Sequence, residues 1–580
     1  MRRSFPLRTR PDFVVTLLTQ GRLADVLLLQ HFGTESVTDT TGPVTGDSGK
    51  AVDANNNNTV NKPLGGSTPP ASTGAAVVVP SRRAALHERC NAARVAAMQS
   101  VCPGSWFPRD RDAAGEWRCA LPNSWDSVRA SPTSGGGPHR KALLHGSFTT
   151  VTDGNQPTVG TIRLLAAQEG ATSGGAPLLL SLPLDPAAGG VEIGHAVGGV
   201  CNVTVRGAEA MVVADTPAAA DAFTAEQNLL AAAACSGLIG RLLEVCSLHA
   251  THTTRYDALL IRNPSVQKSL ALMACARYGV DAMMSFVMGR SDKEALQSQH
   301  VTQPAEAPLN GGDGDLQLPV VESVVLGTYA SQALAVALQL TREMLGSAAR
   351  LDSLIDVPHL SKNERLIPYA YAQQMLCNEP HVLASLAVGD SAQHRRYIAP
   401  LLSCAAANGV PAAPMGTEGV ASSLFMWAMN APPTSLRLVA PHVYLRLSAN
   451  ELEGDVATFL KHLREKGLRN DPAFVRTAAV YTAEVFSSVA VLYRATAALT
   501  RTGNNAPRDW LLAQTFCSES AGLRAAALRE FDAGKDARAV LRRNGGVCDT
   551  AHPVELMNAA PVKKKAPAAP RTTPAVGGAK

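Results

Sequence analysis

The chain has 580 residues, which is enough for roughly three or four domains with sizeable cores. Its 53 Lys and Arg exceed its 48 Asp and Glu by 5, and much of this excess lies near the ends. A nearly neutral middle gives no broad basic face, so we expect no nucleic-acid binding. No apolar run reaches about 18 residues, so we expect no transmembrane segment. The 11 scattered cysteines form no CxxC pair, which predicts free thiols and no metal site.

The first 32 residues begin with four arginines before the first acid, Asp12. A basic, acid-poor start is typical of a mitochondrial transit peptide, although a disordered basic tail has the same composition. Residues 12–32 also predict one or two short helices. Residues 33–80 are low in complexity and predict a disordered linker. A helix is expected over residues 84–101, followed by a loop-rich stretch over 103–138.

Short apolar runs separated by turn residues then fill the stretch from Leu143 to Val213. Turn pairs such as Asp153-Gly154 and Gly189-Gly190 lie between these runs. About six short strands in so few residues predict a small all-β domain, either a barrel or a sandwich. The expected strands are residues 144–151, 161–165, 178–182, 191–195, 201–205 and 211–213.

Residues 224–289 predict two long helices joined by a short polar turn. Thr224 and Gln227 have the spacing of a capping box, which predicts that the first helix begins at Thr224 and ends near residues 251–254. Asn263 and Pro264 predict the N-cap and the first residue of the second helix.

Gly237 and Gly240, on one helix of the hairpin, suggest close contact with another element.

Further helices follow the hairpin. The Asp- and Gly-rich run at 310–315 lacks the bidentate glutamate of a calcium loop, so we expect a flexible insertion there. The remaining expected helices are residues 320–345, 367–388 and three within 443–531, with breaks at 470–472 and 503–507 and a linker at 409–433.

Several stretches resemble acyl-CoA dehydrogenases. Residues 144–154 resemble the motif beside the flavin in the family's β domain, and residues 234–267 resemble its first long C-terminal helix, turn and next helix. Residues 511–517 and 545–553 are similar to the extra C-terminal domain of very-long-chain acyl-CoA dehydrogenase and its complex I assembly paralogue, and residues 491–496 fit the same domain. The resemblance covers about residues 119–400 and 445–556.

The resemblance implies a multidomain α+β acyl-CoA dehydrogenase fold. It would comprise a reduced N-terminal helical part, a β-barrel middle domain, a four-helix C-terminal domain and an extra C-terminal helical bundle. The implied parts are 1–32 (transit peptide and short helices), 33–80 (linker), 81–118 (residual helical region), 119–216 (β barrel), 217–405 (four-helix domain), 406–442 (linker), 443–556 (extra bundle) and 557–580 (disordered basic tail).

The family's reaction uses a glutamate that removes a proton from an acyl-CoA while FAD takes a hydride. The resemblance places that base at Tyr371 or, with a shift of one residue, at Ala370 or Ala372. Neither alanine can take a proton, and tyrosine with its ordinary pKa is a poor base at neutral pH. Some relatives place the glutamate on the first long helix, where Gln227 stands here with Glu226 beside it. Glu226 is therefore the candidate for a displaced base.

The resemblance also assigns positions near the flavin, and most of them have changed. Thr150 replaces a tryptophan over the flavin, and the Thr-Glu-Pro run becomes residues 120–122. Thr253 stands where an arginine would reach the pyrophosphate, and Asp257 replaces a glycine in the same turn. The other candidate cofactor-binding residues are Thr152, Arg255, Tyr256, Gln267 and Gly346, the last followed by a serine instead of a second glycine.

Two hypotheses follow from the retained framework and the altered site. In the first, the chain is catalytically degenerate and acts as a structural or assembly partner, as a homodimer, with a catalytic paralogue, or on an inner-membrane complex such as complex I. In the second, it is a divergent FAD-dependent enzyme that oxidises long-chain acyl-CoA to trans-2-enoyl-CoA. Either would work in the mitochondrial matrix, and the first binds FAD weakly or not at all.

Overall fold

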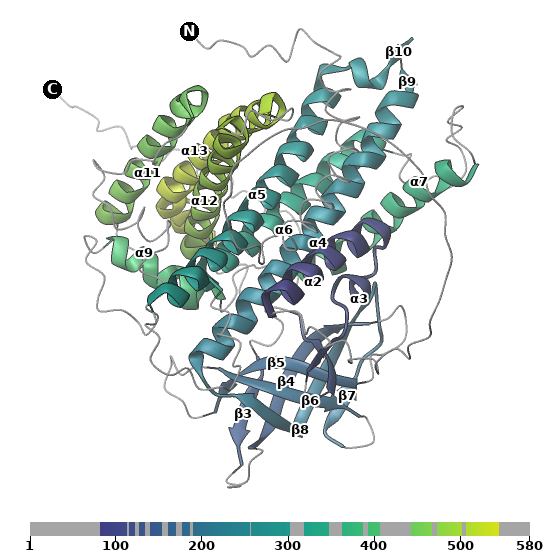
Figure 1. Cartoon of the computed structure of the whole chain (residues 1–580), viewed down its shortest axis with the longest axis vertical. Helices are drawn as coiled ribbons and strands as arrows, with labels where there is room; N and C mark the ends of the chain where they lie inside the picture. The colour runs from purple at the N-terminus through teal and green to yellow at the C-terminus, as the bar shows by residue number, and fades with distance from the viewer. Residues whose placement is uncertain are drawn as a thin grey trace, which may run out of the picture. The chain divides into compact units, whose positions relative to one another are not determined.

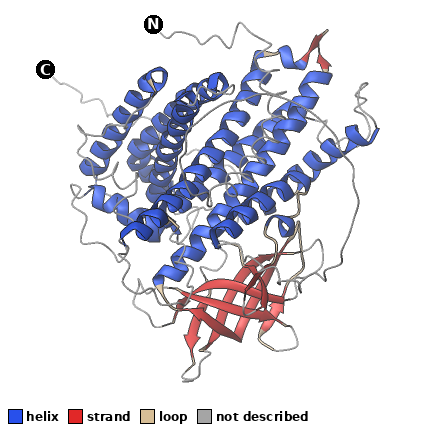
Figure 2. Cartoon of the chain, in the orientation of Figure 1, coloured by secondary structure: helices blue, strands red, loops and turns tan. Residues whose placement is uncertain are grey.

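The structure is a computed structural model that combines long helices with one main sheet (Figures 1 and 2). The chain divides into residues 1–527 and 528–580, and only the last part of α13 is described in the second unit. The expected transit peptide, linkers, calcium-like run, motif at 545–553 and basic tail lie outside the described residues. The described residues are 82–112, 115–121, 127–133, 140–152, 160–169, 177–185, 189–255, 257–301, 318–346, 362–386, 393–406, 442–466, 472–500 and 506–544.

Helices come before and after the strands of the main sheet, and the short strands β9 and β10 lie between α4 and η3. The helices are α2 (Arg82–Gln99), α3 (Pro103–Trp106), α4 (Pro217–His252), η3 (Leu260–Arg262), α5 (Pro264–Val301), α6 (Val320–Leu345), α7 (Lys362–Cys377), α8 (Glu379–Leu386), η5 (His394–Ile398), α9 (Ala399–Ala406), η7 (Val443–Leu445), α11 (Arg446–Lys466), α12 (Pro472–Thr500) and α13 (Ala506–Asn544). The strands are β1 (Asp110–Asp112), β2 (Gly115–Cys119), β3 (Arg129–Pro132), β4 (Lys141–Val151), β5 (Gly160–Gln168), β6 (Leu178–Leu184), β7 (Val191–Ile193), β8 (Val200–Ala214), β9 (Thr254–Arg255) and β10 (Ala258–Leu259).

The main sheet has the strand order β1-β2-β5-β3-β4-β8-β6, and β7 pairs with β8. Strand β5 also pairs with β6, so the pairings return from β6 to β3 through β5. The parallel contact between β3 and β5 joins only Arg129 with Ala167 and Ala130 with Gln168, so we describe a mixed sheet and not a barrel. The expected loop-rich stretch at 103–138 was wrong, because it contains β1, β2 and β3.

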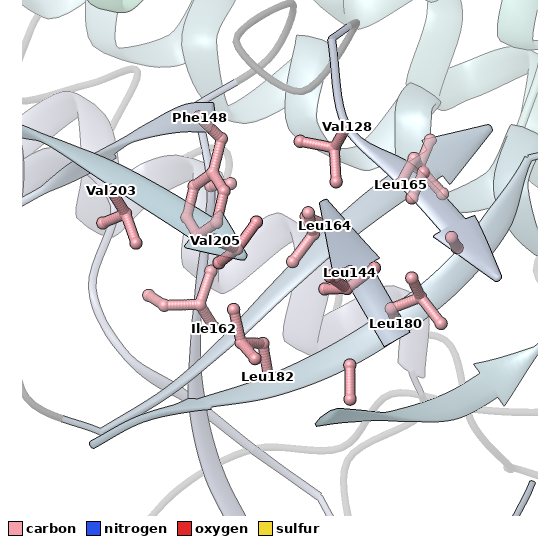
Figure 3. Packing of buried hydrophobic residues seen from close by; sticks show 14 of the residues in the cluster. Val128, Leu144, Phe148, Ile162, Leu164, Leu165, Leu180, Leu182, Val203 and Val205 are labelled. Carbon is pink, nitrogen blue, oxygen red and sulfur yellow. The ribbon is translucent and has the colours of Figure 1, made fainter. Parts of the chain in front are cut away.

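The core of the sheet is built by alternation along its strands. Strand β8 buries Val203 and Val205 and exposes Asn202 and Arg206, because successive side chains of a strand point to opposite faces. The two strands expected at 201–205 and 211–213 are one continuous strand, β8. Figure 3 shows the buried cluster, with labelled side chains Val128, Leu144, Phe148, Ile162, Leu164, Leu165, Leu180, Leu182, Val203 and Val205.

Helix α4 begins earlier than the capping-box pattern indicates. Its N-cap is Thr216, whose hydroxyl accepts a hydrogen bond from the amide of Ala219, and Pro217 is its first residue. Thr224 lies inside the helix and donates its hydroxyl to the carbonyl of Ala220. The expected start at Thr224 was therefore wrong. The preceding pair Thr216-Pro217 is the stronger signal, because it ends the strand and begins the helix.

The second helix of the hairpin begins as expected. The side chain of Asn263 accepts a hydrogen bond from the amide of Ser265, and Pro264 is the first residue of α5. The helix continues to Val301, well beyond the expected end at Gly289. The expected single helix at 367–388 is instead two helices, α7 and α8, separated at Asn378 before Pro380. Proline cannot donate the next helical hydrogen bond and disfavours the helical conformation of the residue before it.

Both glycines of α4 allow close approach by other helices, as expected. A Cβ atom on Gly237 would lie 2.3 Å from the carbonyl oxygen of Arg94 in α2. A Cβ atom on Gly240 would lie 2.8 Å from the guanidinium of Arg277 in α5. The small size of glycine therefore sets how closely α2 and α5 pack on α4.

A buried carboxylate joins these helices. Asp281 of α5 accepts hydrogen bonds from Arg94 of α2 at 2.9 Å and from Ser236 of α4 at 2.6 Å. Arg277, one turn earlier on α5, lies 3.9 Å away. Burial opposes ionisation, but the three arginines Arg94, Arg277 and Arg494 hold the pKa of Asp281 below its usual range.

The helices α12 and α13 pack on the central helices α5 and α6 through aromatic side chains. Phe486 of α12 lies edge to face with Phe286 of α5 at 5.4 Å between ring centroids. Phe516 of α13 lies 6.2 Å from Tyr329 of α6, and both rings cover Gly279 of α5. The bundle expected within 443–531 is therefore in direct contact with α5 and α6.

Four helices are long and apolar enough to cross a membrane by length and composition alone. They lie at Pro217–His252, Pro264–Gly289, Val320–Leu345 and Phe474–Thr500. Between 67% and 83% of each apolar window is buried inside the fold, and a helix that is apolar on all sides is expected at the centre of a large bundle. The absence of a transmembrane segment stays a prediction.

We predict that Gly237→Ala destabilises the protein by about 1–3 kcal/mol, because its new methyl group must push α2 away from α4. The matched control is Gly522→Ala in α13, where a Cβ atom meets nothing within 4 Å. That control should stabilise the helix by roughly 0.5–1 kcal/mol. Urea unfolding of both variants checks the difference, and equal effects would contradict close packing at Gly237.

Candidate functional site

The two threonines expected beside the flavin lie at the end of β4 and have no accessible surface. Thr150 donates its hydroxyl to the carbonyl of Cys119 at 3.4 Å, and it forms a bridge with Ala120. The amide of Thr152 donates to the carbonyl of Gly199 at 2.9 Å. A side chain without accessible surface cannot contact a cofactor unless the residues that cover it move.

The cover over Thr152 comes from the segment that leads into α3. The thiol of Cys102 donates to the carbonyl of Thr152 at 3.5 Å. A Cβ atom on Gly199 would lie 2.4 Å from Pro103, so this turn and the start of α3 are in tight contact. Trp106 of α3 is fully buried and donates its indole N–H to the carbonyl of Ser100. The residues of the chain itself thus fill the space beside the end of β4.

Glu226, the candidate displaced base, lies in the third turn of α4 and is occupied by an ion pair. Its carboxylate binds the guanidinium of Arg89 in α2, which also binds Asp110 at 2.8 Å. The same guanidinium lies 5.9 Å from the ring centroid of Trp117. Burial lowers the pKa of Arg89, but the two carboxylates outweigh it and raise this pKa. Glu226 therefore joins α2 to α4.

Tyr371, which the sequence resemblance assigns to the position of a catalytic base, has a structural role in α7. Its ring is buried, and its hydroxyl donates to the carbonyl of Ala97 near the end of α2. The guanidinium of Arg241 in α4 lies 5.7 Å from its ring centroid. Burial raises the pKa of Tyr371 above its ordinary value, although Arg241 opposes the shift, so its hydroxyl stays protonated at neutral pH.

The candidate pyrophosphate-binding residues lie in the turn after α4, but their side chains give little support for such a site. Thr253 is the C-cap of α4, and Arg255 is exposed in the two-stranded hairpin of β9 and β10. Tyr256 lies outside the described residues. Asp257 has a φ of 60°, which glycine adopts freely and which aspartate tolerates better than most residues. Asp257 therefore adopts a backbone conformation that is typical of glycine.

Gln267 and Gly346 have backbone roles. The amide of Gln267 donates to the carbonyl of Asn263 in the first turn of α5. Gly346 is the C-cap of α6, with a φ of 52° that explains its identity without a cofactor. Its neighbour Ser347 lies outside the described residues.

The candidate residues form two groups at opposite ends of α4. Glu226 lies near the sheet, and Thr253 caps the other end 27 residues later. At 1.5 Å per residue, the two positions are about 40 Å apart along the helix axis. One chain therefore does not bring Thr150, Thr152 and Glu226 together with Thr253 and Arg255 around a single cofactor.

Two buried polar groups were not predicted as such from the sequence. Gln227 is 1% exposed, and within the described chain both its amide atoms lack a hydrogen-bond partner. His249 lies against Tyr369 of α7, with 3.3 Å between Nδ1 and the phenol oxygen, and against the hydroxyl of Thr253 at 3.2 Å. Periodicity predicts that His249 lies on the apolar face of the helix, and Gln227 was expected in a capping box with Thr224. Only the neighbouring elements define what the two side chains contact.

The environment of His249 favours its neutral form. Burial, and then the positive charge of Arg255, lower the pKa of His249 to about 4. Burial, with a smaller effect of Cys246, raises the pKa of Tyr369 to about 12. Among the described residues, no group of three His, Cys, Asp or Glu side chains could hold a metal ion.

No family model matches the chain, and no curated protein matches it. Solved structures similar to it include an acyl-CoA dehydrogenase complexed with FAD from Bacillus anthracis (13% identity, 71% of this chain and 68% of that chain, TM-score 0.47). Others are ACDH-11 from Caenorhabditis elegans in complex with C11-CoA (14%, 77% and 74%, 0.41) and acyl-CoA oxidase3 from Yarrowia lipolytica (13%, 78% and 73%, 0.45). At such low identities and TM-scores, the likeness decides neither the fold nor the function.

The residues at the expected flavin positions do not fit FAD. Thr150 and Thr152 are fully covered, and neither offers a ring to lie over the flavin. Of the expected contacts, Arg255 alone combines a positive charge with exposure. No step of a redox reaction is therefore assigned to these residues.

We predict that His249 makes the protein less stable in acid. Its neutral form is favoured in the folded state, so its contribution is complete above pH 6.5 and is lost as the pH falls towards 4. The loss should be on the order of 3 kcal/mol. The difference in unfolding free energy between the wild type and His249→Gln should therefore shrink over this range. The exposed-histidine control His195→Gln should follow the wild type, and a constant difference for His249→Gln would contradict the prediction.

Proposed function

We propose that this protein is a non-catalytic chain with an acyl-CoA dehydrogenase-like architecture and that it works by association with other proteins. The observation that carries the proposal is the environment of Tyr371, the residue that the sequence resemblance assigns to the position of the catalytic glutamate. Its hydroxyl is bound to the carbonyl of Ala97, and its pKa is raised by burial. A protonated, buried phenol bound to the backbone cannot remove a proton from a substrate.

The other candidate base supports the same proposal. Glu226 is bound by Arg89, so proton abstraction would require breaking a half-buried ion pair. The residues expected around FAD lie about 40 Å apart in one chain, measured along α4. A complete set would need a second copy, and Arg255 is exposed. This favours a homodimer, or a heterodimer with a catalytic paralogue in which the partner does the chemistry.

The basic, acid-poor N-terminus favours the mitochondrial matrix as the site of action. Within it, an inner-membrane complex such as complex I during assembly is the proposed larger partner. This part rests on the sequence resemblance of the C-terminal stretches, and it is the most specific part of the proposal.

The absorbance spectrum of the purified native protein tests the proposal. We expect no flavin bands, no reduction of an electron acceptor on adding long-chain acyl-CoA, and recovery with a protein partner in fixed stoichiometry. A yellow protein that reduces an acceptor when acyl-CoA is added would overturn the proposal and favour the divergent enzyme.

A second prediction separates the two roles of Glu226. We expect Glu226→Gln to lower the free energy of unfolding by about 1–3 kcal/mol, because Arg89 loses one of its two carboxylates. Acceptor reduction should stay at background in both the wild type and the variant. Glu192→Gln, in an exposed pair with Arg206, is the control and should change stability by less than about 0.5 kcal/mol. Wild-type turnover that the Glu226→Gln change alone abolishes would identify Glu226 as a base.

A further inference from the structure

The C-terminal helices α11, α12 and α13 meet through buried polar side chains where an apolar contact would be expected. Arg524 of α13 is 2% exposed, and Glu484 of α12 is 6% exposed. Ser488 and Ser520 lie between them and are also buried. Burying a charged side chain in a helical bundle is costly unless an opposite charge lies beside it. The partners of Arg524 and Glu484 therefore indicate which ionisation state of each side chain the bundle favours.

Arg524 is balanced by Asp455 of α11. Its Nε and Nη2 donate to the same carboxylate oxygen of Asp455 at 2.9 and 2.8 Å. Its Nη1 donates to the hydroxyls of Ser488 and Ser520, each at 2.9 Å. In the described bundle the hydrogen bonds of Arg524 thus go to Asp455 and two serines.

Glu484 is bound through a hydroxyl and not directly through a cation. Ser520 of α13 donates its hydroxyl to the carboxyl oxygen Oε2 of Glu484 at 2.6 Å. The other groups that face Glu484 are Arg524, one serine away, and the phenol of Tyr329 in α6. Because Arg524 already pairs with Asp455, an ionised Glu484 would add a negative charge that nothing in the described bundle neutralises directly.

The titration of Glu484 agrees with this geometry. Burial raises the pKa of Glu484, and the hydrogen bond from Ser520 and the charge of Arg524 oppose the shift without cancelling it. Burial also raises the pKa of Tyr329, and Glu484 adds to that shift, so the phenol stays neutral. A neutral carboxyl is therefore the form that suits the docked helices.

We propose that the contact between α12 and α13 is a proton-dependent latch. Neutral Glu484 is buried at little cost when α13 docks, whereas ionised Glu484 opposes docking, because burying its charge costs more than the hydrogen bond from Ser520 and the charge of Arg524 return. When α13 separates, water reaches Glu484 and its carboxyl ionises as an ordinary glutamate does. Docking therefore binds a proton, and docking weakens as the pH rises from about 4.5, the ordinary value for glutamate, through its raised value.

Hydrogen exchange of the full chain, read by mass spectrometry on peptides from residues 506–527, tests the latch. Rates between pH 5 and pH 9 are corrected for intrinsic chemistry. In the wild type, protection should fall as the pH rises, by at most about tenfold per pH unit. In Glu484→Gln, which is always neutral, protection should not depend on pH and should exceed that of the wild type at high pH. The matched control Glu519→Gln, an exposed residue next to Ser520, should follow the wild type.

Three outcomes would overturn the latch. Protection of α13 in the wild type that rises with pH would show that the docked helix prefers the ionised carboxylate, and this needs no variant. Equal pH slopes in the wild type and Glu484→Gln would assign the slope to another group. Low protection of Glu484→Gln at every pH, beside a stably folded Ser520→Ala variant, would show that the charged form is the one that holds the helix.

Discussion

The ion pair between Asp281 and Arg94 is the contact on which the helical part of this protein depends. It joins α5 to α2 across 187 residues of sequence, and Ser236 adds α4 to the same carboxylate. Arg494 of α12 contributes its charge to Asp281 as well. Removing one partner would leave the other charge buried without balance, which is far more costly than losing an exposed pair. The close contact at Gly237 fits the same docking of α2.

The position of α2 in turn decides what the candidate site can do. Arg89, near its middle, binds Glu226, and the carbonyl of Ala97, near its end, accepts a hydrogen bond from Tyr371. Both residues that could have served as a base are therefore partners of the same helix. Their side chains hold α2 against α4 and α7 in the described chain.

The two buried polar clusters handle charge in different ways. Asp281 is surrounded by arginines and is held ionised, so it acts as a permanent joint between α2, α4 and α5. Glu484 shares its surroundings with an arginine that Asp455 already neutralises, so burial favours its neutral form. The Asp281 cluster therefore stays charged, whereas the Glu484 cluster can gain or lose a proton. The pH-dependent stability thus lies near the C-terminal end of the described chain, where a helix can separate without unfolding the rest.

The sequence by itself determined the elements whose signals are local. Asn263-Pro264 predicted the start of α5, and Gly237 predicted a close contact between helices. These signals are local, because a capping residue or a glycine affects the backbone only within a few residues. The resemblance that assigns Tyr371 to the position of a catalytic glutamate also comes from the sequence alone. The sequence did not reveal strands β1 to β3, whose pairing partners are distant in the chain, or the true start of α4. The tertiary structure alone decided that Glu226 pairs with Arg89, because an ion pair between residues 137 positions apart depends on packing and not on any local pattern.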